Sequence, residues 1–160
     1  ALCVAGPHAH ATFNGSRIVH AALYTRRCPM KVVVILLAVL PQEIEITDLN
    51  GNLPIHIAAQ IKPRDELDMM DFVEVLVEIC RFFPDGARKP NLQGKLPLTL
   101  MIGAQQPWQI LSIVLGAHPA AVLDQGLGRF ATCTLLSRLD TEVRYRLLRD
   151  APFLLEQYRT

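Results

Sequence analysis

The sequence predicts an all-α fold built from stacked helix–turn–helix repeats, and three observations support it. Residues 48–59 (DLNGNLPIHIAA) and 91–102 (NLQGKLPLTLMI) place glycine, leucine and proline at the same positions, 43 residues apart. A glycine series recurs at intervals of 36, 43 and 34 residues: Gly15, Gly51, Gly94 and Gly128. A proline series recurs at intervals of 34, 43, 35 and 33 residues: Pro7, Pro41, Pro84, Pro119 and Pro152. Periods of this length are typical of repeat arrays.

The two series divide the chain into one array of about four units, residues 14–47, 48–90, 91–123 and 124–160. Residues 1–13 are expected to be the tail of a truncated preceding unit, so the array should continue before Ala1 and end near Thr160. The second unit is longer than the others. Its surplus lies in Ile61–Met70 (IKPRDELDMM), a charged segment with an internal proline. We predict a loop inserted at 61–70, and such a loop is a candidate docking feature.

Each unit is expected to open with a tight turn and a short helix. In the second unit, Asp48 and Gly51 are typical turn residues, because Asp bonds nearby amides and Gly tolerates positive φ. Leu53 precedes a proline and is therefore extended. Pro54 suits the first helical position, where its missing N–H is not needed. The apolar and small residues that follow predict a closely packed first helix.

Apolar runs that stop at prolines predict the second helices. Val32–Leu40 ends at Pro41 and is predicted to be a buried helix. Phe72–Phe83 is apolar except for one narrow stripe of Glu74, Glu78 and Arg81, and the segment around Ile110–Leu115 repeats this pattern. A helix that is apolar nearly all round is expected to lie between two neighbours. The predicted last helix, Glu142–Ala151, has a broad polar face and suits a terminal unit.

Charge and hydropathy argue against two classes of partner. The formal net charge is +1, so a nucleic-acid-binding surface is not expected. Met30 and Lys31 followed by Val32–Leu40 imitate a signal sequence. However, nine apolar residues fall far short of the roughly 20 needed to cross a bilayer. We predict neither nucleic-acid nor membrane binding.

Individual reactive residues favour structural roles. The four cysteines form no C-x-x-C pair, which predicts no zinc or redox motif and weakly favours an intracellular compartment, cytoplasm or nucleus: Cys3, Cys28, Cys80 and Cys133. His8 and His10 lack further metal ligands, and His118, before a proline, is expected to be exposed. The carboxylates of the inserted loop are expected to be solvated: Asp65, Glu66 and Asp68. We predict no metal, cofactor or catalytic residue, and expect Trp108 to pack against a neighbouring unit.

The second unit resembles the ankyrin repeat, whose consensus runs D-x-x-G-x-T-P-L-H-x-A-A. The matching residues are Asp48, Gly51, Pro54, His56, Ala58 and Ala59, with Gly94, Pro97 and Leu98 in the third unit and Gly128 in the last. The resemblance covers roughly residues 14–152. It implies that His56, and His20 as its counterpart in the first unit, have a structural role bracing adjacent units. Tetratricopeptide and HEAT-type repeats remain alternatives, but both lack the turn glycine.

The chain departs from the ankyrin pattern at several positions. The threonine of the consensus is replaced by Leu53, Leu96 and Phe130, so no hydroxyl is present there to cap the helix or hold the histidine. Thr99 and Cys133 stand where the histidine is expected, and Pro84 and Pro119 replace a glycine. The array is therefore a divergent L-P-L variant.

The resemblance implies a monomeric module that binds another protein through its turns and concave helix face and does no chemistry. The expected contacts are turn residues beside the fixed glycines: Leu49, Asn50, Asn52, Lys89, Leu92, Gln93, Lys95, Gln125 and Arg129. The alternative is a regulatory or spacer segment of a larger enzyme whose catalytic domain lies upstream. A small enzyme in its own right is the least favoured hypothesis.

Overall fold

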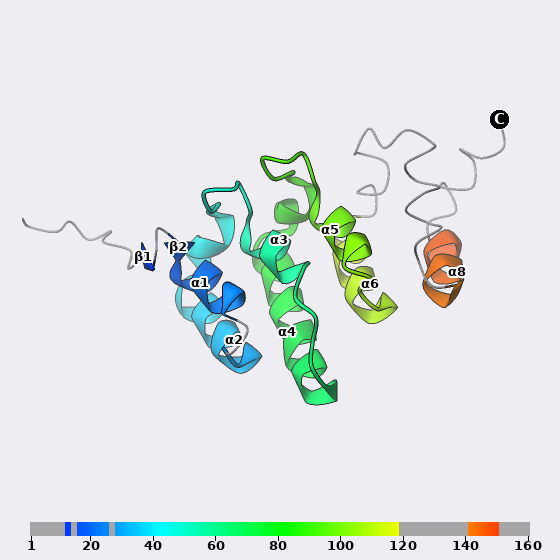
Figure 1. Cartoon of the computed structure of the whole chain (residues 1–160), viewed down its shortest axis with the longest axis horizontal. Helices are drawn as coiled ribbons and strands as arrows, with labels where there is room; N and C mark the ends of the chain where they lie inside the picture. Colours follow the sequence, from blue (N-terminus) through cyan, green and yellow to red (C-terminus); the bar gives the residue numbers. More distant parts are fainter. Residues whose placement is uncertain (1–11, 14–15, 26–27, 119–140, 151–160) are drawn as a thin grey trace, which may run out of the picture.

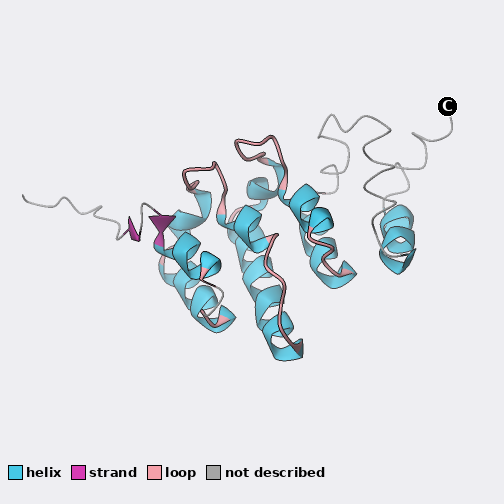
Figure 2. Cartoon of the chain, viewed as in Figure 1, coloured by secondary structure: helices cyan, strands magenta, loops and turns pink. Residues whose placement is uncertain are grey.

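The computed structural model describes residues 12–13, 16–25, 28–118 and 141–150. Apart from a pair of two-residue antiparallel strands, β1 (Thr12–Phe13) and β2 (Ser16–Arg17), the regular structure in these ranges is helical (Figure 2). The fold is therefore all-α, as predicted. The α-helices are α1 (Ile18–Tyr24), α2 (Met30–Val39), α3 (Pro54–Ala58), α4 (Glu66–Phe82), α5 (Pro97–Gly103), α6 (Trp108–Ala117) and α8 (Thr141–Asp150). Two 3-10 helices are η1 (Pro41–Glu45) and η2 (Pro84–Arg88).

Six of these helices form three hairpins, α1–α2, α3–α4 and α5–α6, that lie side by side (Figure 1). The first helices contact one another in the order α1, α3, α5, and the second helices in the order α2, α4, α6. The result is two layers of helices, with the turns 46–53 and 89–96 projecting at one end. The core runs between the layers and includes Leu23, Leu37, Leu76, Met101 and Ile110, all nearly inaccessible to solvent.

The short helices begin as the sequence predicts. Pro54 and Pro97 occupy the first helical positions, and the preceding Leu53 and Leu96 are extended, with ψ of 162° and 156°. Thus the L-P step sets the entry angle of each first helix.

Prolines also terminate the second helices. α2 ends at Val39 and α4 at Phe82, and Pro41 and Pro84 then open the 3-10 turns η1 and η2. Each 3-10 turn redirects the chain toward the next projecting turn. The final described helix, α8, covers the predicted Glu142–Ala151 segment except for Ala151, which lies outside the described ranges.

The prediction of an inserted loop at 61–70 is wrong in its second half. Glu66–Met70 belongs to α4, which has 17 residues against 10 in α2 and 10 in α6. Asp65 caps the helix by accepting a hydrogen bond from the Asp68 N–H. Acidic residues in the first turn also suit the positive end of the helix dipole. The insertion therefore lengthens a helix, and only residues 61–65 form a connection.

Two burial predictions also need correction. α2 is fully buried only along Met30, Val33 and Leu37. Val34 and Leu36 are half-buried, and the remaining apolar residues of the helix are exposed: Val32, Ile35, Ala38 and Val39. His118 is 6% exposed rather than open to water. It lies at the C-terminal end of α6, where its backbone N–H donates to the Val114 carbonyl. No helix among the described residues is long and apolar enough to span a membrane.

Candidate protein-binding turns

The projecting turn of the second unit is organised around the Asp48 carboxylate. Its Oδ1 accepts hydrogen bonds from the backbone N–H groups of Asn50 and Asn52, both at 2.8 Å, and its Oδ2 accepts the Tyr24 hydroxyl at 2.7 Å. Partial burial raises the pKa of Asp48, but these hydrogen bonds outweigh it and hold the pKa below its usual value. The carboxylate is therefore charged at neutral pH and locks the turn.

The turn of the third unit repeats the device with a neutral side chain. Asn91 occupies the place of Asp48, and its Oδ1 accepts the backbone N–H groups of Gln93 and Lys95, both at 3.0 Å. Gly94, like Gly51, has positive φ, 71° and 72° respectively, which glycine adopts without strain. The two turns thus have the same local geometry from different sequences.

Neighbouring turns are joined by direct hydrogen bonds. The Leu92 N–H donates to the Asn50 carbonyl at 3.2 Å, and the Asn91 side-chain amide donates to Asn52 Oδ1 at 2.9 Å. A Cβ added at Gly51 would lie only 2.9 Å from the Leu92 backbone nitrogen, so glycine is needed there for close approach as well as for φ. The turns therefore form a connected row.

Buried histidines attach the row to the first helices. His20 and His56 are both inaccessible and occupy the third position of their helices. His20 Nε2–H donates to the Asn52 carbonyl at 3.1 Å, and this bond links the first unit to the projecting turn of the second unit. The Leu53 N–H donates to His56 Nδ1 at 3.2 Å, so a backbone group holds the ring in place of the missing threonine.

Burial sets the charge state of both rings. It lowers the pKa of His20 and His56, although nearby backbone carbonyls, of Asn52 for His20 and of Lys89 and Lys95 for His56, act in the opposite direction. His56 Nε2 has no partner within hydrogen-bonding geometry among the residues that the structure describes. Two neutral, buried rings that bond to backbone suit the structural role expected of them.

Six of the nine predicted contact residues are exposed turn residues: Leu49, Asn50, Lys89, Leu92, Gln93 and Lys95. We call this set the turn surface. Leu49 and Leu92, one at the same place in each turn, are 82% and 78% exposed. Asn52 does not belong to the surface, because it is 7% exposed and its side chain bonds to Asp48 and Asn91. Gln125 and Arg129, with Gly128, lie outside the described ranges.

Three polar contacts between distant residues could not be found from the sequence. Glu43 accepts the Val19 N–H at 2.9 Å and so caps α1 from the following 3-10 turn. Gln106 donates to the carbonyls of Ala59 and Ile61, which lie in the preceding unit. The Tyr24–Asp48 bond also joins two units. Each pairs residues at least 24 apart, and no local pattern signals them.

The chemical alternatives gain no support from the geometry. Burial raises the pKa of Cys80 to about 11, and no hydrogen bond joins its thiol to His56 in the described ranges. Cys28 and Cys80 are both free thiols, whereas Cys3 and Cys133 lie outside the described ranges, as do His8 and His10. Among described residues, no group of three His, Cys, Asp or Glu side chains is placed to hold a metal.

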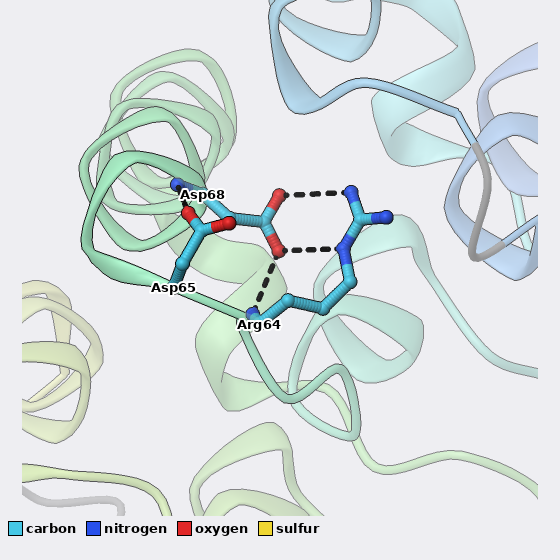
Figure 3. Close-up of polar contacts among 3 residues, drawn as sticks. All are labelled: Arg64, Asp65 and Asp68. Atoms are coloured by element: carbon cyan, nitrogen blue, oxygen red, sulfur yellow. Dashed lines mark hydrogen bonds and ion pairs between the residues drawn. The ribbon is translucent and has the colours of Figure 1, made fainter.

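Two carboxylates of the segment predicted to be a loop, Asp65 and Asp68, form hydrogen bonds at the start of α4 (Figure 3). Asp68 accepts the Arg64 backbone N–H at 2.9 Å and its guanidinium at 3.3 Å, and the guanidinium lowers the pKa of Asp68. A pocket of about 140 Å³ lies beside them, lined by Leu23, Met30, Ile61 and Lys62 together with Arg64 and Asp68. It is smaller than the roughly 300 Å³ at which small-molecule sites usually begin. The bonds of Arg64, Asp65 and Asp68 therefore stabilise the N-terminus of α4 rather than form a small-molecule site.

Comparisons of the chain with protein-family models, curated proteins and solved structures found no match.

Proposed function

We propose that the chain is a divergent ankyrin-like array that binds another protein through its turn surface. The observation that carries the proposal is the pair Leu49 and Leu92, which are more than three-quarters exposed at the tips of adjacent, hydrogen-bonded turns. Two leucines at the same place in successive units form an apolar feature that solvent alone does not favour. Exposed apolar groups of this kind are typical of binding surfaces.

The rigidity of the turns supports the same proposal. Asp48 and Asn91 each accept two backbone N–H groups, and the inter-turn bonds tie one turn to the next. A surface that is already ordered loses little conformational entropy when a partner binds. Polar and cationic side chains beside the leucines, Asn50, Gln93 and Lys95, supply directional contacts around an apolar centre.

The test compares three chains as baits in affinity capture from the lysate of the source organism, read by mass spectrometry. One is the native chain, and one carries Leu49→Ser with Leu92→Ser. The matched control carries Leu67→Ser with Met70→Ser, because these α4 residues are similarly exposed but lie away from the turns. All three should have the same thermal transition, since no buried group changes.

A protein retained by the native chain and the α4 control, but lost by the turn variant, is the expected result. Calorimetry with that purified protein should then show at least a tenfold weaker Kd for the turn variant, or about 1.4 kcal/mol. Adding Asn50→Ala with Gln93→Ala should weaken binding further. If every retained protein is retained equally by all three baits, the turn surface does not bind and the proposal fails.

A further inference from the structure

One side of α2 is apolar but is only partly covered by the described part of the chain. Val32 is 41% exposed, and Leu36, one turn further along the same side, is half-buried. The buried stripe of α2, Met30, Val33 and Leu37, lies on the adjoining side of the helix, since Val33 and Leu36 are three residues apart. α2 is therefore apolar on two adjoining faces, and its described neighbours cover one of them fully and the other only in part.

The other two second helices show what covers this face. Aligning the helices on the prolines that end them, Pro41, Pro84 and Pro119, pairs Val32 with Val75 and Ile110, and Leu36 with Ile79 and Val114. In α4 and α6 these positions are at most 1% exposed. The same register positions are therefore closed in the second and third units and only partly covered in the first.

The neighbours of each helix account for the difference. α2 contacts its own first helix, α1, and the elements that follow it, α4 and η1. α4 has the corresponding neighbours, α3, α6 and η2, but in addition contacts α2 and η1 of the preceding unit. Within the described ranges, a preceding helix hairpin is thus present beside α4 and absent beside α2. The side of α2 that carries Val32 and Leu36 corresponds in register to positions that are closed in the two helices that follow a preceding hairpin.

We infer that the Val32–Leu36 face of α2 is a docking surface for another helix hairpin of the same repeat type. The complementary face is the one that α2 itself presents to α4, an aliphatic stripe like Met30, Val33 and Leu37. The contact would continue an interface that the structure already forms twice, between α2 and α4 and between α4 and α6. This surface lies on the second helices and is independent of the turn surface.

The test uses the complete chain with one internal duplication. Residues 12–47 are repeated in tandem, so that 1–47 is followed by 12–160. Thr12 stands at the place of Asp48, 36 residues before it, so the junction keeps the register of the repeat. The second copy of α2 would then have a hairpin on its open face. Val32→Glu is introduced into the native chain, and separately into that second copy.

In the native chain Val32→Glu should leave the thermal transition nearly unchanged, because the side chain has access to water. In the duplicated chain it should lower the midpoint by at least about 5 °C, because the carboxylate becomes buried without a partner. The matched control is Ala38→Glu. Its register partners, Arg81 and Gly116, are exposed in the other units, so it should be neutral in both chains.

Two results would overturn the inference. One is a duplicated chain in which Val32→Glu is as harmless as Ala38→Glu, which would mean that the added hairpin does not cover α2. The other is a duplicated chain whose extra residues show no helical signal or melt in a separate transition, which would mean that the face does not accept a hairpin.

Discussion

The paired turn glycines allow the inter-turn contact to be measured by substitution. Gly51 and Gly94 have nearly the same φ, 72° and 71°, so alanine at either site incurs the same left-handed strain, about 1–2 kcal/mol. Their surroundings differ. A Cβ at Gly94 would meet no described residue within 4 Å, whereas a Cβ at Gly51 would lie 2.6 Å from Leu92 Cγ and 2.9 Å from the Leu92 nitrogen. Of the two substitutions, Gly51→Ala is therefore the one that requires the neighbouring turn to move.

The expected difference follows from what that movement breaks. Displacing Leu92 lengthens its hydrogen bond to the Asn50 carbonyl, which is 3.2 Å in the native turn. Losing one such bond costs about 0.5–1.5 kcal/mol, and the steric overlap adds to this. We therefore expect Gly51→Ala to destabilise the chain by at least about 1 kcal/mol more than Gly94→Ala. For a chain of this size that is roughly 2–4 °C in Tm.

Urea denaturation followed by far-ultraviolet circular dichroism, with both variants at the same pH and temperature, measures the difference. The double variant Gly51→Ala with Leu92→Ala divides the effect. It should recover the side-chain part of the clash but not the part due to the backbone nitrogen. Equal losses for Gly51→Ala and Gly94→Ala would refute the reasoning, because the two turns would then not be in contact.

Three further predictions concern buried groups. Burial lowers the pKa of His20 and His56 below 6.5, so the unfolded chain binds more protons at these rings, and the free energy of unfolding should fall as the pH drops below about 6.5. Replacing both histidines by glutamine should flatten this pH dependence in urea titrations, and an unchanged slope would contradict the prediction. Burial raises the pKa of Cys80 to about 11, so its thiol should react with iodoacetamide at pH 8 at least about 100-fold more slowly in the folded chain than in urea. Peptide mass spectrometry measures both rates, and equal rates would show that the Cys80 thiol is not buried. Glu43→Ala should cost about 1–3 kcal/mol by leaving the Val19 N–H without its acceptor. Glu43→Gln, which keeps an acceptor, should cost less in the same urea experiment; equal losses would show that the hydrogen bond is not what Glu43 contributes.

Much of the local structure follows from short stretches of sequence. The L-P steps at Leu53 and Leu96 restrict the backbone directly, and glycine at 51 and 94 meets a local demand for positive φ. Pro41 and Pro84 stop helices because proline cannot continue them. The all-α class and the placement of helices and turns are therefore local consequences of the residues concerned.

Burial and pairing were decided by tertiary structure. Asn50 and Asn52 are both turn asparagines, yet Asn50 is exposed and Asn52 is buried. Asn52 is buried because the side chain of Asn91, from the next turn, bonds to it. Asp65 begins a helix where charge and proline had suggested a loop. These outcomes depend on which groups approach from distant parts of the chain.

The two surfaces proposed for binding show the same division. The sequence by itself determined that Leu49 and Leu92 occupy matching places in successive turns, and that α2 is apolar on more than one side. Only the tertiary structure decided that the two leucines stay exposed on joined turns, and that Val32 is open where Val75 and Ile110 are closed. The reason is physical: periodicity specifies the direction in which a side chain points, whereas exposure depends on whether another element lies in that direction.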